Sequence, residues 1–217
     1  MALAIFDLDE TLISSDSDYE WGQYIAGEGL VNAEEHKYQN NLFYQQYKAG
    51  LLDVDEYFRF ACSVLKAHPP DFLKHHLEIF ITERIEPVVL PKAIELVDWH
   101  RNKGNHLMVI TSTIEFITRP IVDIFGIETL IAPIPEFIAG RYTGKIEGVP
   151  SFGPGKVICL NAWLKKSKYN LEGSFFYSDS HNDLPLLRQV DHPIAVDPDP
   201  LLRQEAKDQK WPIVTLR

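Results

Sequence analysis

The chain has 217 residues, 45% of them apolar and 24% charged, which suits one large soluble domain or a core with a modest second unit. Its formal net charge of −10 argues against broad binding to nucleic acid or to an anionic membrane surface. No apolar run approaches a membrane span of about 20 residues, and the start of the chain lacks the pattern of a signal peptide. We therefore expect a cytoplasmic protein with neither nucleic acid nor membrane as a partner.

The first predicted element is a buried parallel strand over Leu3–Phe6, an apolar run that ends at an aspartate. Over residues 18–83, aromatic and aliphatic side chains recur at helical spacing. Asn32, Asp53 and the pair Pro69 and Pro70 divide this stretch, as residues that start or interrupt helices do. We interpret it as a helical insertion almost without strands.

Beyond Pro87 the predicted strands and helices alternate. Strands are expected over residues 106–110, 129–132, 174–177, 194–196 and 213–215, and helices over 91–103, 115–125, 154–166, 184–190 and 201–207. Residues 136–145, which turn at Gly140, resemble a hairpin. This alternation predicts an α/β fold with a doubly wound, Rossmann-like parallel sheet and helices on both faces.

Polar residues follow several of the predicted strands. In a sheet of this type, ligands bind outside the carboxyl ends of the strands. The polar positions there are Asp7, Asp9, Glu10 and Thr11 after the first strand, Thr111 and Ser112 after the second, and Asp179, Ser180, His181, Asn182 and Asp183 after a later one. Lys156 lies close to the start of a helix between the last two groups. Because these stretches meet at one edge of the sheet, they predict an active site.

The residue types in these motifs suit phosphoryl transfer. A carboxylate such as Asp7 attacks phosphorus and forms an aspartyl-phosphate, which divides a difficult hydrolysis into two easier steps. Mg²⁺ bound by Asp7, Asp179 and a backbone carbonyl near Asp9 would cancel the repulsion between carboxylates and phosphate. Lys156 supplies a second positive charge, and Thr111 supplies a hydroxyl donor to a phosphoryl oxygen. Asp9 is left to protonate the leaving alkoxide and then to activate water.

The sequence resembles the phosphatases of the haloacid dehalogenase superfamily, in which an Asp-x-Asp-x-Thr motif follows an apolar strand. The positions that match the family's motifs in order are Asp7, Asp9, Thr11, Thr111, Lys156, Asp179 and Asp183. The resemblance implies that Asp7 is the nucleophile and Asp9 the general acid/base. It also implies that Asp7, Asp179 and the carbonyl of Asp9 bind Mg²⁺, and that Asp183 orients Lys156 or a metal-bound water. Further supporting residues are Ser112 and Asn182.

The helical insertion looks like the cap of the phosphoserine-phosphatase-like branch. The resemblance implies a catalytic core of residues 1–15 and 87–217 and a helical cap of residues 16–86. The cap is expected to close over the substrate, with hinges near residues 14–15 and 86–87.

Two cap positions bear on the substrate. In phosphoserine phosphatases an acidic residue soon after the first motif holds the substrate amine, and Asp16 occupies that place. An arginine of the cap holds the substrate carboxylate, whereas the matching position here is Ala61. Arg59 lies roughly 200° around the helix from it and is no simple replacement. The resemblance therefore favours a substrate with an amine and no carboxylate.

Histidinol phosphate fits that description, and relatives of this branch include histidinol phosphatases of histidine biosynthesis. Asp16, with Asp18 or Glu20, is then expected to bind the ammonium group. Tyr19 or Trp21 is expected to stack on the imidazole. Phosphoserine, the substrate of a serine-biosynthetic enzyme, stays open as the alternative, as do other small phosphate esters such as phosphoethanolamine.

Two other kinds of protein use similar residues. A phospho-receiver signalling domain shares the acidic cluster, the lysine and the doubly wound sheet, but its phosphoacceptor follows a later strand and it carries no large helical cap. A phosphomutase uses the same motifs and differs in whether its cap admits water or a second substrate.

Overall fold

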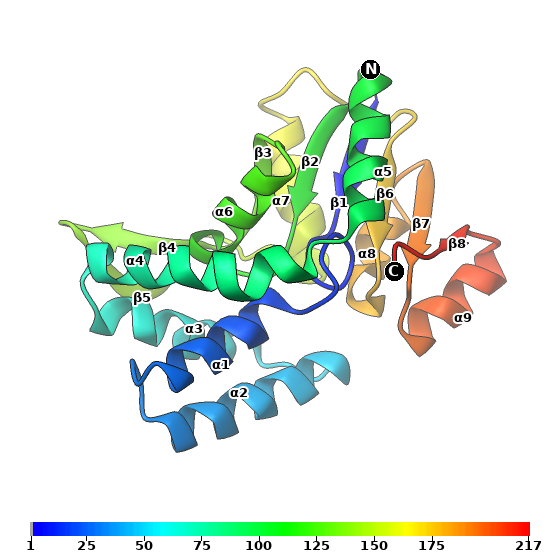
Figure 1. Cartoon of the computed structure of the whole chain (residues 1–217). Coiled ribbons are helices and arrows are strands. Elements are labelled where there is room, and N and C mark those ends of the chain that lie inside the picture. Colours follow the sequence, from blue (N-terminus) through cyan, green and yellow to red (C-terminus); the bar gives the residue numbers. More distant parts are fainter. Residues whose placement is uncertain (1) are drawn as a thin grey trace.

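The computed structural model describes residues 2–217 and centres on a six-stranded parallel sheet (Figure 1). The strands are β1 (Leu3–Phe6), β2 (His106–Ile110), β3 (Thr129–Ile131), β6 (Phe175–Ser178), β7 (His192–Val196) and β8 (Ile213–Val214). Their order is β3-β2-β1-β6-β7-β8, and every neighbouring pair is parallel. The chain runs outward from β1 in one direction and from β6 in the other, so the switch point of the topology lies between β1 and β6.

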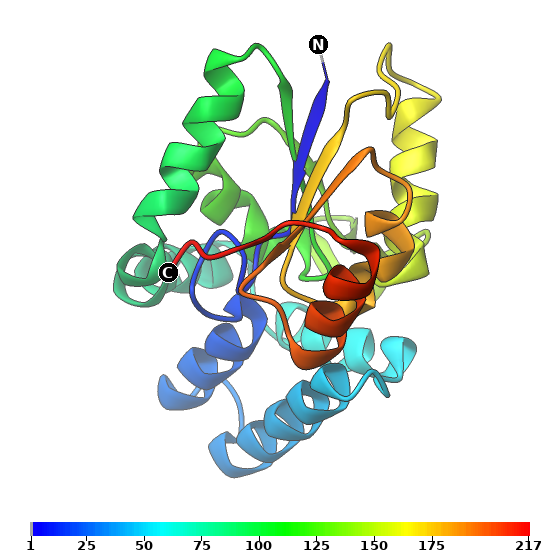
Figure 2. The same ribbon diagram turned by 90° about the vertical axis from the view of Figure 1, so that its right-hand side faces the viewer.

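Helices cover both faces of this sheet, as Figure 2 shows with α5 on one side and α7 on the other. The helices of the sheet region are α5 (Pro91–Asn102), α6 (Glu115–Ile124), α7 (Pro154–Leu164), α8 (Leu184–Leu187) and α9 (Pro200–Gln209). Side chains of a strand alternate between faces, so Phe6 packs in the same core as Val97 of α5, whereas Ile5 packs in the core of Leu160 of α7. The predicted doubly wound α/β fold is confirmed.

The helical insertion lies beyond the carboxyl ends of the central strands (Figure 1). It contains α1 (Ser17–Gly27), α2 (Ala33–Lys48), α3 (Val54–Ala67) and α4 (Pro70–Phe80), followed by a π-helical turn (Ile81–Ile85) and a 3₁₀ turn (Glu86–Val88). The side chains of Asp16, Asn32 and Asp53 each accept a hydrogen bond from a backbone N–H in the first turn of the helix that follows. The helix starts are thus fixed locally, and the division into a core and a separate cap domain stays a prediction.

Two further features join the helical insertion to the sheet region. A two-stranded antiparallel hairpin, β4 (Ile134–Ile138) and β5 (Arg141–Glu147), packs against α3. The two connections run side by side, because Ile13 pairs with Val89 and the N–H of Ser14 donates to the carbonyl of Val88 at 2.9 Å. These contacts lie next to the predicted hinges.

Most predicted elements match the structure to within a few residues. The helix expected over residues 184–190 is shorter, Leu184–Leu187, and a 3₁₀ turn (His181–Asp183) precedes it. Within residues 2–217 no helix combines the length and apolarity needed to cross a bilayer.

Candidate active site

Lys156 joins two acidic motifs at the carboxyl end of the sheet. Its Nζ lies 3.0 Å from Oδ1 of Asp7 and 2.8 Å from Oδ2 of Asp183, and all three side chains are buried. The hydroxyl of Ser178 donates to the same Asp183 oxygen at 2.7 Å. Burial lowers the pKa of Lys156, but the charges of Asp183 and Asp7 outweigh it and raise the pKa above its usual value. The lysine is therefore a fixed cation between two carboxylates.

The loop that precedes α7 is tied to the loop that follows β2. Ser151 donates through its hydroxyl to the carbonyl of Thr111 at 2.7 Å, and Ser112 donates to the carbonyl of Ser151 at 3.2 Å. A Cβ atom at position 155 would lie 2.1 Å from the carbonyl oxygen of Pro150, so Gly155 is required for this close approach. The loop thereby holds the start of α7, and with it Lys156, against the β2 motif.

Each carboxyl oxygen of Asp9 accepts one hydrogen bond. The backbone N–H of Ser17, at the start of α1, donates to Oδ1 at 2.7 Å, and the hydroxyl of Thr113 donates to Oδ2 at 2.8 Å. Burial raises the pKa of Asp9 above its ordinary value, and these hydrogen bonds oppose the shift. The sequence reasoning missed Thr113, although it stands two residues after Thr111 in the same motif.

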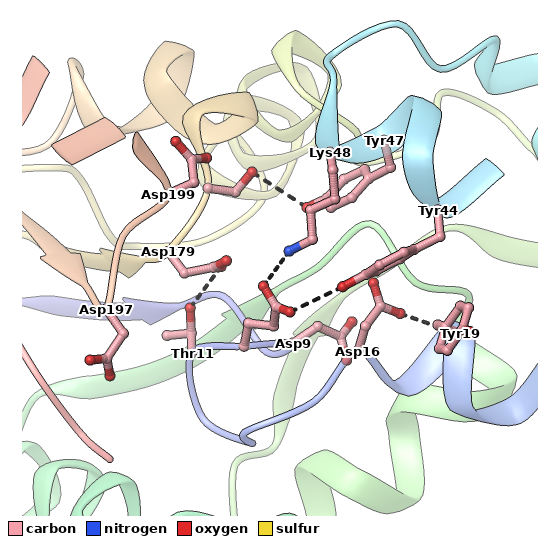
Figure 3. A network of polar contacts seen from close by, with 12 residues as sticks. Asp9, Thr11, Asp16, Tyr19, Tyr44, Tyr47, Lys48, Asp179, Asp197 and Asp199 are labelled. Atoms are coloured by element: carbon pink, nitrogen blue, oxygen red, sulfur yellow. Dashed lines mark hydrogen bonds and ion pairs between the residues drawn. The ribbon is translucent and has the colours of Figure 1, made fainter. Parts of the chain in front are cut away.

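Asp179 lies beside the first motif, where the hydroxyl of Thr11 donates to its Oδ1 at 3.2 Å (Figure 3). Burial and then the charge of Asp7 raise the pKa of Asp179 well above its usual range. Two buried carboxylates in mutual repulsion form a donor set that a hard divalent cation fits. Over residues 2–217 no group of three or more His, Cys, Asp or Glu side chains converges as metal ligands. Such a cation would thus also need backbone or water oxygen.

A cavity opens between the motif loops and the helical insertion. Its empty volume is about 560 Å³, which includes the part that is open to solvent. Its lining residues are Asp7, Asp9, Asp16, Asp18, Tyr19, Asn40, Phe43, Tyr44, Tyr47, Leu52, Tyr57, Thr111, Ser112, Thr113 and Phe152. Within the described part of the chain, the lining thus contains four carboxylates and no lysine, arginine or histidine. The sequence reasoning missed the residues of α2 and α3, because helical periodicity does not tell a cavity wall from a core face.

Asp16 and Tyr19, two of the residues expected to bind the substrate, do line this cavity. One oxygen of Asp16 accepts the backbone N–H of Tyr19 at 2.8 Å, so this carboxylate also caps α1. Burial and then the charge of Asp9 raise the pKa of Asp16 well above its usual range. The ring of Tyr19 lies 4.8 Å from that of Tyr44 of α2, and the two rings form one aromatic wall.

Trp21, the third residue expected to bind the substrate, does not line the cavity. Its side chain is buried against Tyr24, Phe80 and Phe116, with ring centroids between 5.2 and 5.9 Å away. The reason is helical geometry, because a residue two positions after Tyr19 points roughly 200° away around α1. Trp21 therefore packs in a hydrophobic core, and it does not lie beside the substrate as expected from the sequence.

The end of α2 docks on the motif loops (Figure 3). Tyr44 donates through its hydroxyl to Oε1 of Glu10 at 3.4 Å, and Lys48 forms an ion pair with the same carboxylate. The carbonyl of Tyr47 accepts a hydrogen bond from the side-chain amide of Asn182 at 3.3 Å. Asn182, expected as a supporting residue, therefore links the β6 motif to α2.

Comparisons with known proteins agree with this arrangement. A family model described as haloacid dehalogenase-like hydrolase matches residues 4–188. A histidinol-phosphatase of Neisseria meningitidis serogroup C is 43% identical, over 99% of both chains. A phosphoserine phosphatase of Mycobacterium tuberculosis is 28% identical, over 100% of this chain and 71% of the relative. A solved Bordetella pertussis protein of unknown function has a TM-score of 0.94 at 40% identity, covering 100% of this chain and 99% of that one. The chain therefore belongs to the haloacid dehalogenase-like hydrolases, as its motifs indicate, and is an enzyme.

Proposed function

We propose that this hydrolase is a magnesium-dependent phosphatase that forms an aspartyl-phosphate on Asp7 and acts on histidinol phosphate in cytoplasmic histidine biosynthesis. The observation that carries the proposal is the cavity at Asp7, whose lining combines four carboxylates and several aromatic rings without a cationic side chain among the described residues. Such a lining suits a phosphate ester that bears an amine and an aromatic ring and lacks a carboxylate. The relative at 43% identity that is named a histidinol-phosphatase supports the choice of substrate.

The two oxygens of Asp7 have different surroundings. Oδ1 accepts hydrogen bonds from the backbone N–H of Leu8 at 2.9 Å and from Lys156 at 3.0 Å. Oδ2 receives no hydrogen bond from any other part of residues 2–217. We assign the attack on phosphorus to Oδ2, because a lone pair that is already engaged by a cation is a weaker nucleophile. Lys156, Thr111 and Ser112 then stabilise the charge on the phosphoryl oxygens.

Asp9 serves as the general acid and then as the general base. Its raised pKa favours the protonated form that gives a proton to the leaving alkoxide. The resulting carboxylate then takes a proton from the water that hydrolyses the aspartyl-phosphate. The donors Ser17 and Thr113 hold both carboxyl oxygens of Asp9 in place for these two steps.

The side chains of Asp7 and Asp179 and the carbonyl of Asp9 would hold Mg²⁺. When bound, the cation offsets the negative charge of the carboxylates and polarises the phosphoryl group. Removal of Mg²⁺ with a chelator should therefore abolish turnover, and its addition should restore it.

Residues 16–86 act in this proposal as a cap that closes over the substrate. The paired connections at Ile13 and Val89 supply a common hinge, and the docking of α2 on Glu10 marks the closed position. Closure excludes water from the aspartyl-phosphate until the leaving alcohol has departed.

Phosphoserine is the second candidate, because the relative from Mycobacterium tuberculosis at 28% identity is named a phosphoserine phosphatase. Phosphoserine carries a carboxylate, which needs a cationic partner to bind tightly. Arg59 is exposed and lies outside the cavity lining, and Ala61 has no polar side chain. The cavity therefore favours histidinol phosphate.

The test is the ratio of kcat/KM for histidinol phosphate to kcat/KM for phosphoserine, measured with Mg²⁺ on the purified protein. We expect histidinol phosphate to be preferred by about 100-fold or more, since a buried carboxylate without a partner is strongly rejected. A preference for phosphoserine would refute the substrate. The variant Asp7→Asn should keep its fold and lose turnover by about 10⁴-fold or more. Normal turnover in that variant would refute the mechanism.

A further inference from the structure

Asp18 and Tyr57 lie together in the part of the cavity wall that the helical insertion supplies. Asp18 belongs to the first turn of α1, Tyr57 belongs to α3, and both side chains line the cavity and are half-buried. Phe43 of α2 lines the same cavity, and its ring meets that of Tyr57 edge to face at 5.8 Å. Three consecutive helices thus place one carboxylate, one phenol and one phenyl ring around a common space.

Asp18 differs from the other three carboxylates of the cavity. Asp7, Asp9 and Asp16 each accept a backbone N–H, from Leu8, Ser17 and Tyr19 respectively. Asp18 accepts no backbone hydrogen bond from residues 2–217. Burial raises the pKa of Asp18 to about 6, and the neighbouring hydroxyl of Tyr57 acts on this pKa in the opposite direction. Removing a carboxylate from water is costly when few donors replace the water. The described chain offers Asp18 few donors, so a ligand can supply the missing partner.

We infer that Asp18, Tyr57 and Phe43 form a subsite for the imidazole ring of the substrate, an inference that rests on the proposed function. An imidazole carries N–H groups at its edge and, when protonated, a positive charge spread over a planar ring. Its edge donates to the carboxylate of Asp18 and meets the hydroxyl of Tyr57, while its face lies against the ring of Phe43. Asp16, with one oxygen committed to the start of α1, keeps the other for the substrate amine.

The experiment compares histidinol phosphate with alaninol phosphate, which has the same amine and phosphate and carries a methyl group in place of the imidazole-bearing side chain. The readout is the ratio of the two kcat/KM values, so that any general loss of activity cancels. In Asp18→Asn we expect this ratio to fall by about 10- to 100-fold, since the amide oxygen carries no charge to pair with a protonated imidazole. In Asp55→Asn, which removes an exposed carboxylate from α3, the ratio should stay at its wild-type value.

A second variant covers the case in which Asp18→Asn fails to fold. Tyr57→Phe keeps the ring and removes only the hydroxyl, so the ratio should fall by about 2- to 10-fold, as for a neutral hydrogen bond. An unchanged ratio in the folded variants would overturn the subsite. If the wild-type enzyme prefers histidinol phosphate to phosphoserine and the variants still leave the ratio unchanged, the inference fails alone. If the wild-type enzyme prefers phosphoserine, the proposed function itself fails.

Discussion

The carboxylates on the two sides of the cavity differ in whether a cationic side chain lies beside them. On the sheet side, Asp7 and Asp183 share the buried cation of Lys156. On the side of the helical insertion, Asp16 and Asp18 carry half-buried carboxylates, and the described lining brings no cation to them. Burial raises the pKa of both residues, and they repel each other as well. The sheet side thus has a buried cation of its own, whereas the side of the helical insertion gains one only with a cationic ligand.

The contrast shows how the two walls divide the work. Phosphoryl transfer demands fixed charges, because stabilising a transition state relies on groups that are already in position. Recognition of a substrate profits from buried groups that lack partners, since an analogue without the matching group leaves them unsatisfied. The cost is stability, because an unpartnered buried carboxylate opposes folding until the ligand binds. The three predictions that follow test this contrast.

The largest effect is expected for Lys156→Met, which removes the buried cation from the sheet side of the cavity. Asp7 and Asp183 then remain buried without a cationic partner, and the free energy of unfolding should fall by about 3–5 kcal/mol. Urea unfolding in the presence of a chelator measures this, with the exposed Lys166→Met as the matched control. If the free energy of unfolding falls no more than in the control, the buried charges of Asp7 and Asp183 do not need Lys156 for stability.

The variant Asp18→Asn is expected to raise the free energy of unfolding, whereas Lys156→Met lowers it. The folded protein holds the pKa of this carboxyl at about 6, against an ordinary 3.8, so the unfolded chain gives up its proton first as the pH rises. Stability is therefore lost between these two values and stays lower above them. The variant removes this penalty and should gain up to about 3 kcal/mol at a pH of about 7.5.

Urea unfolding of Asp18→Asn and of wild type across that pH range provides the measurement. The gain should shrink as the pH falls from about 6 toward about 4, because the wild-type carboxyl then takes up its proton. Asp55→Asn, which removes an exposed charge, should change stability by less than about 0.5 kcal/mol. A gain that does not depend on pH would point to a cause other than the buried charge.

The smallest effect is expected for Lys48→Met, at the contact between the walls. The side chains of Lys48 and Glu10 are 35% and 25% exposed, so solvent screens their ion pair. Its loss should cost about 0.2–1 kcal/mol, and added salt should diminish the difference. Lys37→Met, at an exposed position of the same helix, is the control, and equal values for the two variants would remove Glu10 as an anchor of α2.

The sequence permitted a good prediction of the fold, and each success has a local cause. The strand at Leu3–Phe6 is apolar at every position, since helices cover both faces of the sheet around it. Asn32 and Asp53, which divide the insertion, act as helix caps. Each accepts a hydrogen bond from the backbone N–H of a residue only three positions further along the chain. The motif positions meet because the carboxyl ends of parallel strands share one edge.

The site residues that the sequence reasoning misplaced or missed are those whose position depends on contacts between different helices. Trp21 and Tyr19 are equally aromatic and two residues apart, yet only Tyr19 faces the cavity. Nothing in the spacing of Phe43 or Tyr57 shows which face of α2 or α3 turns toward the motifs. That choice depends on how the helices pack on one another and on the sheet.

The sequence by itself determined the parallel sheet, the acidic motifs at its edge and the family, because these follow from strand periodicity and short-range spacing. Only the tertiary structure decided which oxygen of Asp7 receives no hydrogen bond from residues 2–217, that Thr113 holds Asp9, and that Asp18 and Tyr57 line one cavity. Each of these depends on atoms brought together from distant parts of the chain. Their distances and burial arise from packing, which no local pattern of residues encodes.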